Sequence, residues 1–272
     1  MKRLLVTVAL AFVAVPAFAA IQYDFIQKHT TDDAVTPTRD LSGRATIDGA
    51  RSRVDFLSGN VYPPGTYVIS TDGSRRLFFV DPTNKWYTEI NTSGFATALG
   101  AAEIKITNQK SEMEPRTDTA KIAGYEAKHQ RLTLSFDVTV TMKGIPLRQH
   151  ARVEIDAWTT DQFPEQQSAL DAMRTGNPEI DAVLEAESTK IHGFPLRRTV
   201  AIHLTSEVAV KSQLQLPRSK TITRETLVTS IREANPDAML FVVPVSYKRA
   251  EQPDAPRTET KTITFDPEPG SE

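Results

Sequence analysis

The stretch from Leu132 to Lys143 constrains the fold more than any other part of the sequence. Apolar side chains at the even positions alternate with polar ones at the odd positions throughout it. Because successive side chains of a β-strand point to opposite faces, this pattern predicts a long strand with one apolar and one wet face. Gly144-Ile145-Pro146 interrupts the alternation, which resumes from Ala151 to Trp158. Two such segments across a short break predict an antiparallel pair.

The same periodicity recurs elsewhere and predicts further strands. Asp72-Gly73 and Asp81-Pro82-Thr83-Asn84 are turn signals, so the N-terminal strands form a meander. Leu77 to Val80 is apolar on both faces, which indicates that a second layer covers it. The pattern does not decide which side chains of residues 66–80 point inward, since those on both faces of the strands are apolar. The predicted strands are 51–57, 66–71, 77–80, 85–90, 200–204 and, more weakly, 221–228.

Three short segments have helical spacing instead. Apolar residues recur at i, i+3, i+4 and i+7 from Phe95 to Ala102, and similar stripes occur in 164–174 and 178–184. Asn177 is a suitable N-cap and Pro178 suits a first helical turn. The expected fold is therefore mainly β with minor α: a curved antiparallel sheet, an unclosed β-barrel, whose concave apolar face is covered by two or three short helices.

The N-terminus resembles a cleavable export signal. Lys2 and Arg3 precede an apolar run too short to span a bilayer, and Ala17-Phe18-Ala19 is a peptidase-type site. We therefore expect a signal peptide at 1–19 and a periplasmic location in a Gram-negative bacterium. A single domain is expected at 20–248, followed by a Pro-rich linker, a possible short edge strand and a tail at 249–272. The chain has no cysteine, so neither disulfides nor thiolate chemistry is available.

Motifs for catalysis are not found. The five histidines form no metal-binding spacing, and no nucleophile elbow or phosphate-binding glycine loop occurs. His129, His150 and His203 lie on or beside polar strand faces, where we expect solvated side chains. The 32 basic and 34 acidic residues leave no basic excess for nucleic acid. The expectation is a non-enzymatic protein without metal or cofactor, and without a transmembrane segment after signal cleavage.

Several short motifs resemble the periplasmic lipoprotein carriers of the LolA/LolB group and its uncharacterised exported members. They are Arg53-Val54-Asp55-Phe56, Val68 to Gly73, Leu77 to Pro82 and Lys121 to Ala127, within the region from Ile21 to Ile155. The resemblance implies an unclosed barrel with helices over a concave face that accepts acyl chains. The family's functional arginine corresponds to Arg51 or Arg53. The chain is longer than the carriers, and 158–204 has no counterpart.

Two functions follow, with a third more remote. The first is a carrier for an acyl-chain-bearing ligand, a lipid or lipoprotein. The second is an envelope protein-interaction or stress-sensing module on the same fold, and the third is a hydrolase with an unrecognised site. The aromatic cluster from Tyr62 to Tyr87 suits either core packing or a ligand cleft. The candidate ligand-binding residues are Val54, Phe56, Tyr67, Ile69, Phe79, Trp86, Leu132, Leu134, Phe136, Val138, Val140, Val153 and Ile155, with lid candidates Phe95, Leu99, Ile180 and Leu184.

Overall fold

The structure is a computed structural model of the chain. It describes residues 20–32, 38–73, 76–90, 103–142, 145–163, 182–183, 186–187, 189–206 and 219–250. The expected signal peptide and the possible edge strand near 260–265 lie outside these residues. Within this part of the chain, no helix is both long and apolar enough to cross a membrane.

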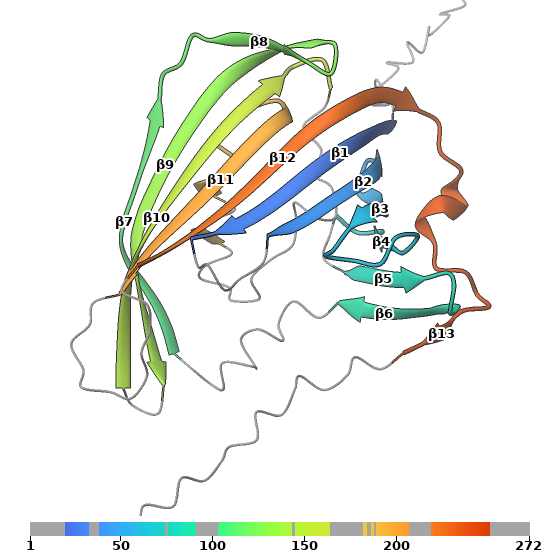
Figure 1. The fold of residues 1–272 in the computed structure, drawn as a ribbon, viewed down its shortest axis with the longest axis horizontal. Helices are drawn as coiled ribbons and strands as arrows, with labels where there is room; N and C mark the ends of the chain where they lie inside the picture. The colour runs from blue at the N-terminus through green and yellow to red at the C-terminus, as the bar shows by residue number, and fades with distance from the viewer. Residues whose placement is uncertain are drawn as a thin grey trace, which may run out of the picture.

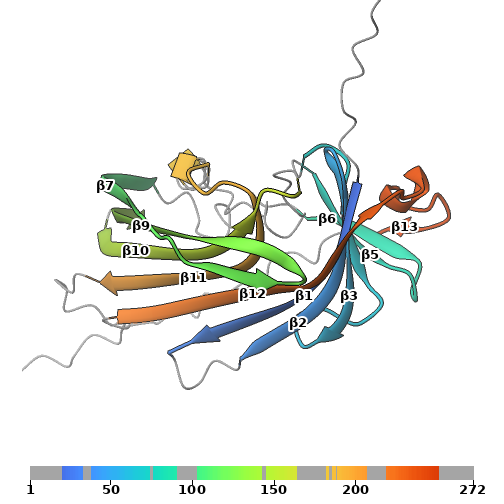
Figure 2. The same cartoon turned by 90° about the horizontal axis from the view of Figure 1, so that it is seen from above.

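One strongly curved sheet contains all the strands of the described residues (Figures 1 and 2). Its order is β13-β6-β5-β4-β3-β2-β1-β12-β11-β10-β9-β7, and β8 pairs with β9. All pairs are antiparallel except β13 with β6. The strands are β1 (Ala20–Thr31), β2 (Arg39–Asp48), β3 (Arg51–Gly59), β4 (Tyr67–Ser70), β5 (Leu77–Asp81), β6 (Trp86–Ile90), β7 (Glu103–Glu114), β8 (Thr119–Ile122), β9 (Tyr125–Met142), β10 (Ile145–Thr160), β11 (Phe194–Ser206), β12 (Ser219–Ala234) and β13 (Lys248–Arg249), with a 3-10 helix η1 (Ala238–Phe241).

The predicted mainly β, unclosed sheet is confirmed. The long alternating stretch is β9, which pairs with β10 so that Met142 faces Ile145. The meander is β4, β5 and β6. Its first turn is wider than a two-residue hairpin, because β4 ends at Ser70 and β5 begins at Leu77. β1, β2, β7, β8 and β13 were not among the predicted strands.

The expected two or three helices over the concave face are not borne out. In the part of the chain that the structure describes, η1 is the one helical element, and isolated helical residues occur at 182–183 and 186–187. The expected segments at 95–102 and 164–174 lie outside the described residues. Each apolar stripe contained only three or four residues, and segments this short depend on tertiary packing rather than on helix propensity.

The sheet bends where β1, β2 and β3 cross the core. The register of β1 with β12 shifts between Asp24 and Phe25. The register of β2 with β3 shifts between Ser42 and Gly43. Such bulges bend a strand and increase its twist. The Phe25 ring lies over Gly43, where an added Cβ would meet Phe25 Cζ at 2.7 Å and the Asp55 carbonyl oxygen at 2.9 Å. The glycine therefore makes room for the aromatic ring at the bend.

Two apolar clusters line the inner face of this curve. The first, which we call the closed cluster, is centred on β1, β2 and β3 and includes Phe25, Phe56 and Phe194, all less than 5% exposed. The second lies on β9, β10 and β11 and forms the candidate site described below.

The C-terminal segment, residues 235–250, covers the opposite face of the meander. Tyr67, Ile69 and Val80 are buried there against Val243 and Tyr247. Arg53 stacks on the Tyr67 ring at 3.7 Å and donates to the Leu240 carbonyl at 3.3 Å. This segment is the second layer that the doubly apolar strand at 77–80 requires.

Candidate ligand-binding face

An apolar trough runs along the inner face of β9, β10 and β11. We define the trough as the buried residues Leu132, Leu134, Phe136, Ala151, Val153 and Ile155 together with the partly buried Ile106, Val138, Val200, Ile202 and Leu204. They share a face because antiparallel partners in direct register point the same way. Val153 pairs with both Leu134 and Ile202, and Ala151 pairs with both Phe136 and Leu204.

The trough is covered unevenly. Leu132 and Leu134 are at most 1% exposed, whereas Val138, Val140, Ile202 and Leu204 are only half-buried. Burial thus decreases along β9 from Leu132 toward Val140. The half-buried end is the part of this face that the described residues leave accessible to a ligand.

A short segment crosses the covered end. We call residues 186–187 and 189–193 the strap (Figure 2). Ile191 packs on the trough, as does the nearby Val183. The Gln130 side chain donates to the His192 carbonyl at 2.7 Å and accepts from the His192 amide at 3.1 Å. Two hydrogen bonds from one amide fix this end of the strap to β9.

The other end of the strap is anchored on β7 by a buried carboxylate. Glu187 is 6% exposed, accepts from Gln109 at 3.3 Å and pairs with Lys190 at 2.7 Å. Lys190 also donates to the Ser111 hydroxyl. Burial alone would raise the pKa of Glu187, but hydrogen bonds from Lys190, Ser111 and Gln109 outweigh it and lower the pKa. The carboxylate therefore stays charged and holds its partners.

The predicted ligand-binding residues divide among three places. Leu132, Leu134, Phe136, Val138, Val153 and Ile155 lie together in the trough, and Val140 continues the same face of β9. Val54 and Phe56 are fully buried in the closed cluster, which Phe79 joins, and the Trp86 ring lies 5.7 Å from that of Phe79. Tyr67 and Ile69 point to the opposite face under the C-terminal segment. Successive side chains of β4 point to opposite faces of the sheet, so Tyr67 and Ile69 do not lie on the face that carries the trough.

The four lid candidates Phe95, Leu99, Ile180 and Leu184 lie outside the described residues. The described neighbour of the last two, Val183, does contact the trough. Sequence reasoning missed the strap's polar anchors, because Gln130, Glu187 and Ser111 belong to no motif.

Arg51 and Arg53 both contact the C-terminal segment. Arg51 lies over the buried Phe241 ring at 5.0 Å, and Arg53 pairs with Asp55 at 2.6 Å in addition to its contacts with Tyr67 and Leu240. Neither of these contacts is with the trough. The role that the family resemblance implied for one of them remains a hypothesis.

His129 differs from the solvated histidine that we expected. Its side chain is only 11% exposed and stacks on Trp158, with ring centroids 4.5 Å apart. Its ring nitrogens contact Asp118 at 3.1 Å and Asp156 at 2.9 Å. Burial lowers its pKa, but the two carboxylates outweigh burial and Arg116, so the pKa is raised above the ordinary 6.5. This cluster links the connection before β8 to β9 and β10.

We expect stability to fall with rising pH because of His129. A histidine whose pKa is raised on folding stabilises the fold fully below the unfolded pKa of about 6.5 and loses that contribution as pH rises through its folded value. Urea unfolding at about pH 6 and about pH 8 should show a larger loss of stability for the wild-type protein than for His129→Gln. Parallel losses in both proteins would contradict this role.

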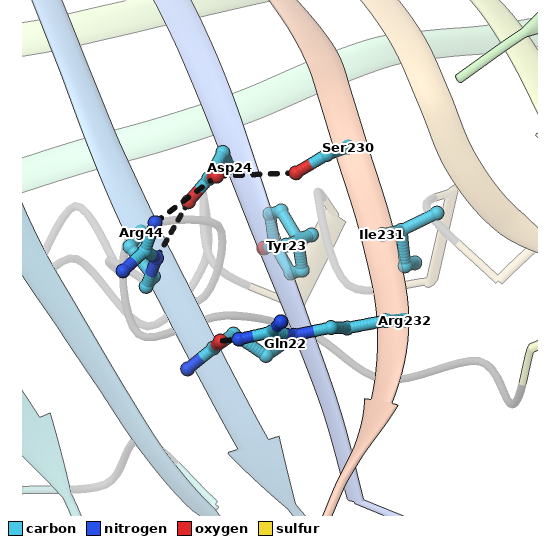
Figure 3. A pocket seen from close by; sticks show the side chains of 7 residues that line it. All are labelled: Gln22, Tyr23, Asp24, Arg44, Ser230, Ile231 and Arg232. Atoms are coloured by element: carbon cyan, nitrogen blue, oxygen red, sulfur yellow. Dashed lines mark hydrogen bonds and ion pairs between the residues drawn. The ribbon is translucent and has the colours of Figure 1, made fainter.

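A small pocket on the outer face is a weaker candidate (Figure 3). It has a volume of about 200 Å³ and is lined from β1, β2 and β12. Arg44 donates to both oxygens of Asp24 at 2.7 and 3.2 Å, and Ser230 contacts Asp24 at 3.1 Å. The hydrogen bond from Arg44 is the largest effect that lowers the pKa of Asp24. Asp24 is paired with Arg44, and Arg232 donates to Gln22, so the polar groups of the pocket already bind one another. The pocket therefore offers a ligand less than the trough does.

Known proteins give a weak match at the level of the fold. No family model and no curated protein matches the chain. A LolA superfamily protein, NE2245 from Nitrosomonas europaea, is similar with a TM-score of 0.34 and 10% identity over 84% of this chain and 91% of that one. MucB, in its complex with MucA(peri), is similar with a TM-score of 0.22 and 10% identity over 80% and 94%. Among the described residues, no group of three or more His, Asp or Glu side chains could hold a metal ion.

Proposed function

We propose that the chain is a non-enzymatic periplasmic binding or carrier protein for an acyl-chain-bearing ligand, a lipid or lipoprotein. The observation that carries this proposal is the half-buried end of the trough. Val138, Val140, Ile202 and Leu204 line the inner face of the sheet, the same face that forms the buried core elsewhere, yet remain partly exposed. Elongated apolar surface of this kind suits a hydrocarbon chain.

The energy of burial is sufficient for such binding. Each methylene moved from water into an apolar site contributes about 0.8 kcal/mol, so a chain of about 16 carbons offers roughly 12 kcal/mol before losses. About half of that remains useful after the entropy of association is subtracted, which corresponds to micromolar or tighter affinity.

The strap supports the same proposal, because polar contacts fix its two ends. Gln130 holds one end and Glu187 with Lys190 the other, while Ile191 alone of the strap residues packs in the trough. Exchanging these hydrogen bonds for water costs little net energy compared with opening an apolar core. The covered end of the trough can thus be widened for a longer chain.

Native mass spectrometry of the protein purified from its own periplasm, with lipid extraction of the same sample, tests this function. We expect an added mass that matches a lipid or lipoprotein recovered in the extract. A clean unliganded mass that persists after challenge with acyl lipids, with no change in the thermal midpoint, would contradict the carrier function.

A second candidate is an envelope protein-interaction module, and one observation favours it. Met239 is 67% exposed and Val245 is fully exposed, next to the 43% exposed Val242 on the C-terminal segment. Recovery of one stoichiometric protein partner from native periplasm, lost when Met239 and Val245 are replaced by Ser, would favour this function. Retention of bound lipid in the same variant would instead support the carrier.

A further inference from the structure

A row of basic side chains, two arginines and a histidine, lies beside the trough on the same inner face. Arg39 of β2 pairs with His29 of β1, and His29 pairs with Arg224 of β12. The row then continues into the trough, since Arg224 pairs with Val200, and Val200 pairs with Ile155. Direct partners share a face, so one row is basic at one end and apolar at the other.

The two arginines of this row have no counter-ion in the described part of the chain. Neither Arg39 nor Arg224 has a carboxylate within ion-pair distance there. Burial and then the charges of Arg39 and Arg224 lower the pKa of His29, which places all three groups near one another. Lys220, which pairs with Leu204, adds another cation to this face.

The outer face of the same strands is arranged differently. There Lys28 pairs in register with Asp40 on one side and Glu225 on the other, and Glu225 forms an ion pair with Arg197 at 2.9 Å. These outer-face charges are therefore balanced, whereas the row Arg39, His29 and Arg224 on the inner face contains no acidic residue. Like charges placed opposite one another destabilise a sheet, so the inner row is costly unless an anion joins it.

We infer that Arg39, His29 and Arg224 bind the oxyanion headgroup, carboxylate or phosphate, of a ligand whose acyl chain lies in the trough. This inference rests on the proposed function and names its ligand class. The two arginines are separated by two strand spacings, about 10 Å, which their long side chains span around one anion. Arginine suits this task because its planar guanidinium donates two parallel hydrogen bonds to an oxyanion.

The test compares anionic and neutral ligands of the same chain length. Affinities of the purified protein are measured for palmitate, dipalmitoyl phosphatidic acid, methyl palmitate and inorganic phosphate. The variant is Arg39→Gln with Arg224→Gln. The matched control is Lys28→Gln with Arg197→Gln, which removes the same two charges from the outer face of neighbouring strands.

We expect the inner-face variant to lose at least about tenfold in affinity for the two anionic lipids and to bind methyl palmitate as before. The outer-face control should bind every ligand as the wild-type protein does. Equal binding of palmitate and methyl palmitate, unchanged by the inner-face variant, would overturn this inference while leaving the carrier function in place. Failure of the wild-type protein to bind any acyl compound would remove the proposed function. Inorganic phosphate binding as tightly as phosphatidic acid would assign the row to free anions and also overturn the inference.

Discussion

Gly43→Val should destabilise the protein by about 3 kcal/mol or more, a large part of the roughly 5–15 kcal/mol that stabilises a typical domain. A Cβ at this position would already lie 2.7 Å from Phe25 Cζ and 2.9 Å from the Asp55 carbonyl oxygen. The first atom belongs to a ring that is only 4% exposed, and the second belongs to the paired backbone of β3. Neither can move without disturbing the bend of the sheet.

Urea unfolding with tertiary fluorescence measures this effect. The matched control is Ser42→Val, one residue earlier, whose side chain lies on the other face and whose hydroxyl is 2.6 Å from the Ser58 hydroxyl. We expect that control to change stability by no more than about 1 kcal/mol. Adding Phe25→Leu to Gly43→Val should recover part of the loss, since the two residues share one contact. An unfolding midpoint of Gly43→Val equal to that of the wild-type protein would contradict the proposed basis of the bend.

Val138→Glu should abolish most binding of acyl chains while leaving the fold intact. Val138 lies on the half-buried part of the trough and pairs with Ile106, so a carboxylate there would face the hydrocarbon. Loss of contact with only two methylenes costs about 1.6 kcal/mol, which is more than tenfold in affinity, and desolvation of the carboxylate adds to it.

Calorimetric titration with palmitate provides the measurement for this variant. Thr139→Glu is the control, because it adds the same group to the next residue on the opposite face of β9, where Thr139 pairs with Lys105 and Arg148. We expect wild-type affinity for that control. Equal affinities for the two variants would show that the acyl chain does not occupy the trough.

The alternating strands were predictable because their two faces differ in polarity. β9 and β10 carry this contrast over most of their length, and their register follows from the short turn between Met142 and Ile145. β1 was missed although Ile21, Tyr23 and Phe25 alternate with Gln22 and Asp24, because the pattern follows directly on the expected signal peptide. β2 contains Gly43 and β7 is mostly exposed and polar, so neither gives a clear apolar face.

The trough could be predicted in part, and the groups around it could not. The inner side chains of β9 and β10 came directly from their periodicity. Tyr67 and Ile69 were grouped with them because both phases of β4 are apolar, and the C-terminal segment that decides the phase is distant in sequence. The row of Arg39, His29 and Arg224 comes from strands far apart in the chain, so it becomes visible only once β1 is paired with β2 and β12.

The location of the bound chain tests the central claim most directly. Methyl NMR spectra of the protein, recorded with a spin-labelled stearate added, report which methyl groups lie near the label. We expect strong broadening at Val138, Ile202 and Leu204 in the trough and none at Ile26, which is 42% exposed on the outer face. Broadening at Ile26 with sharp signals from the trough would contradict the assignment of this face as the acyl-chain site.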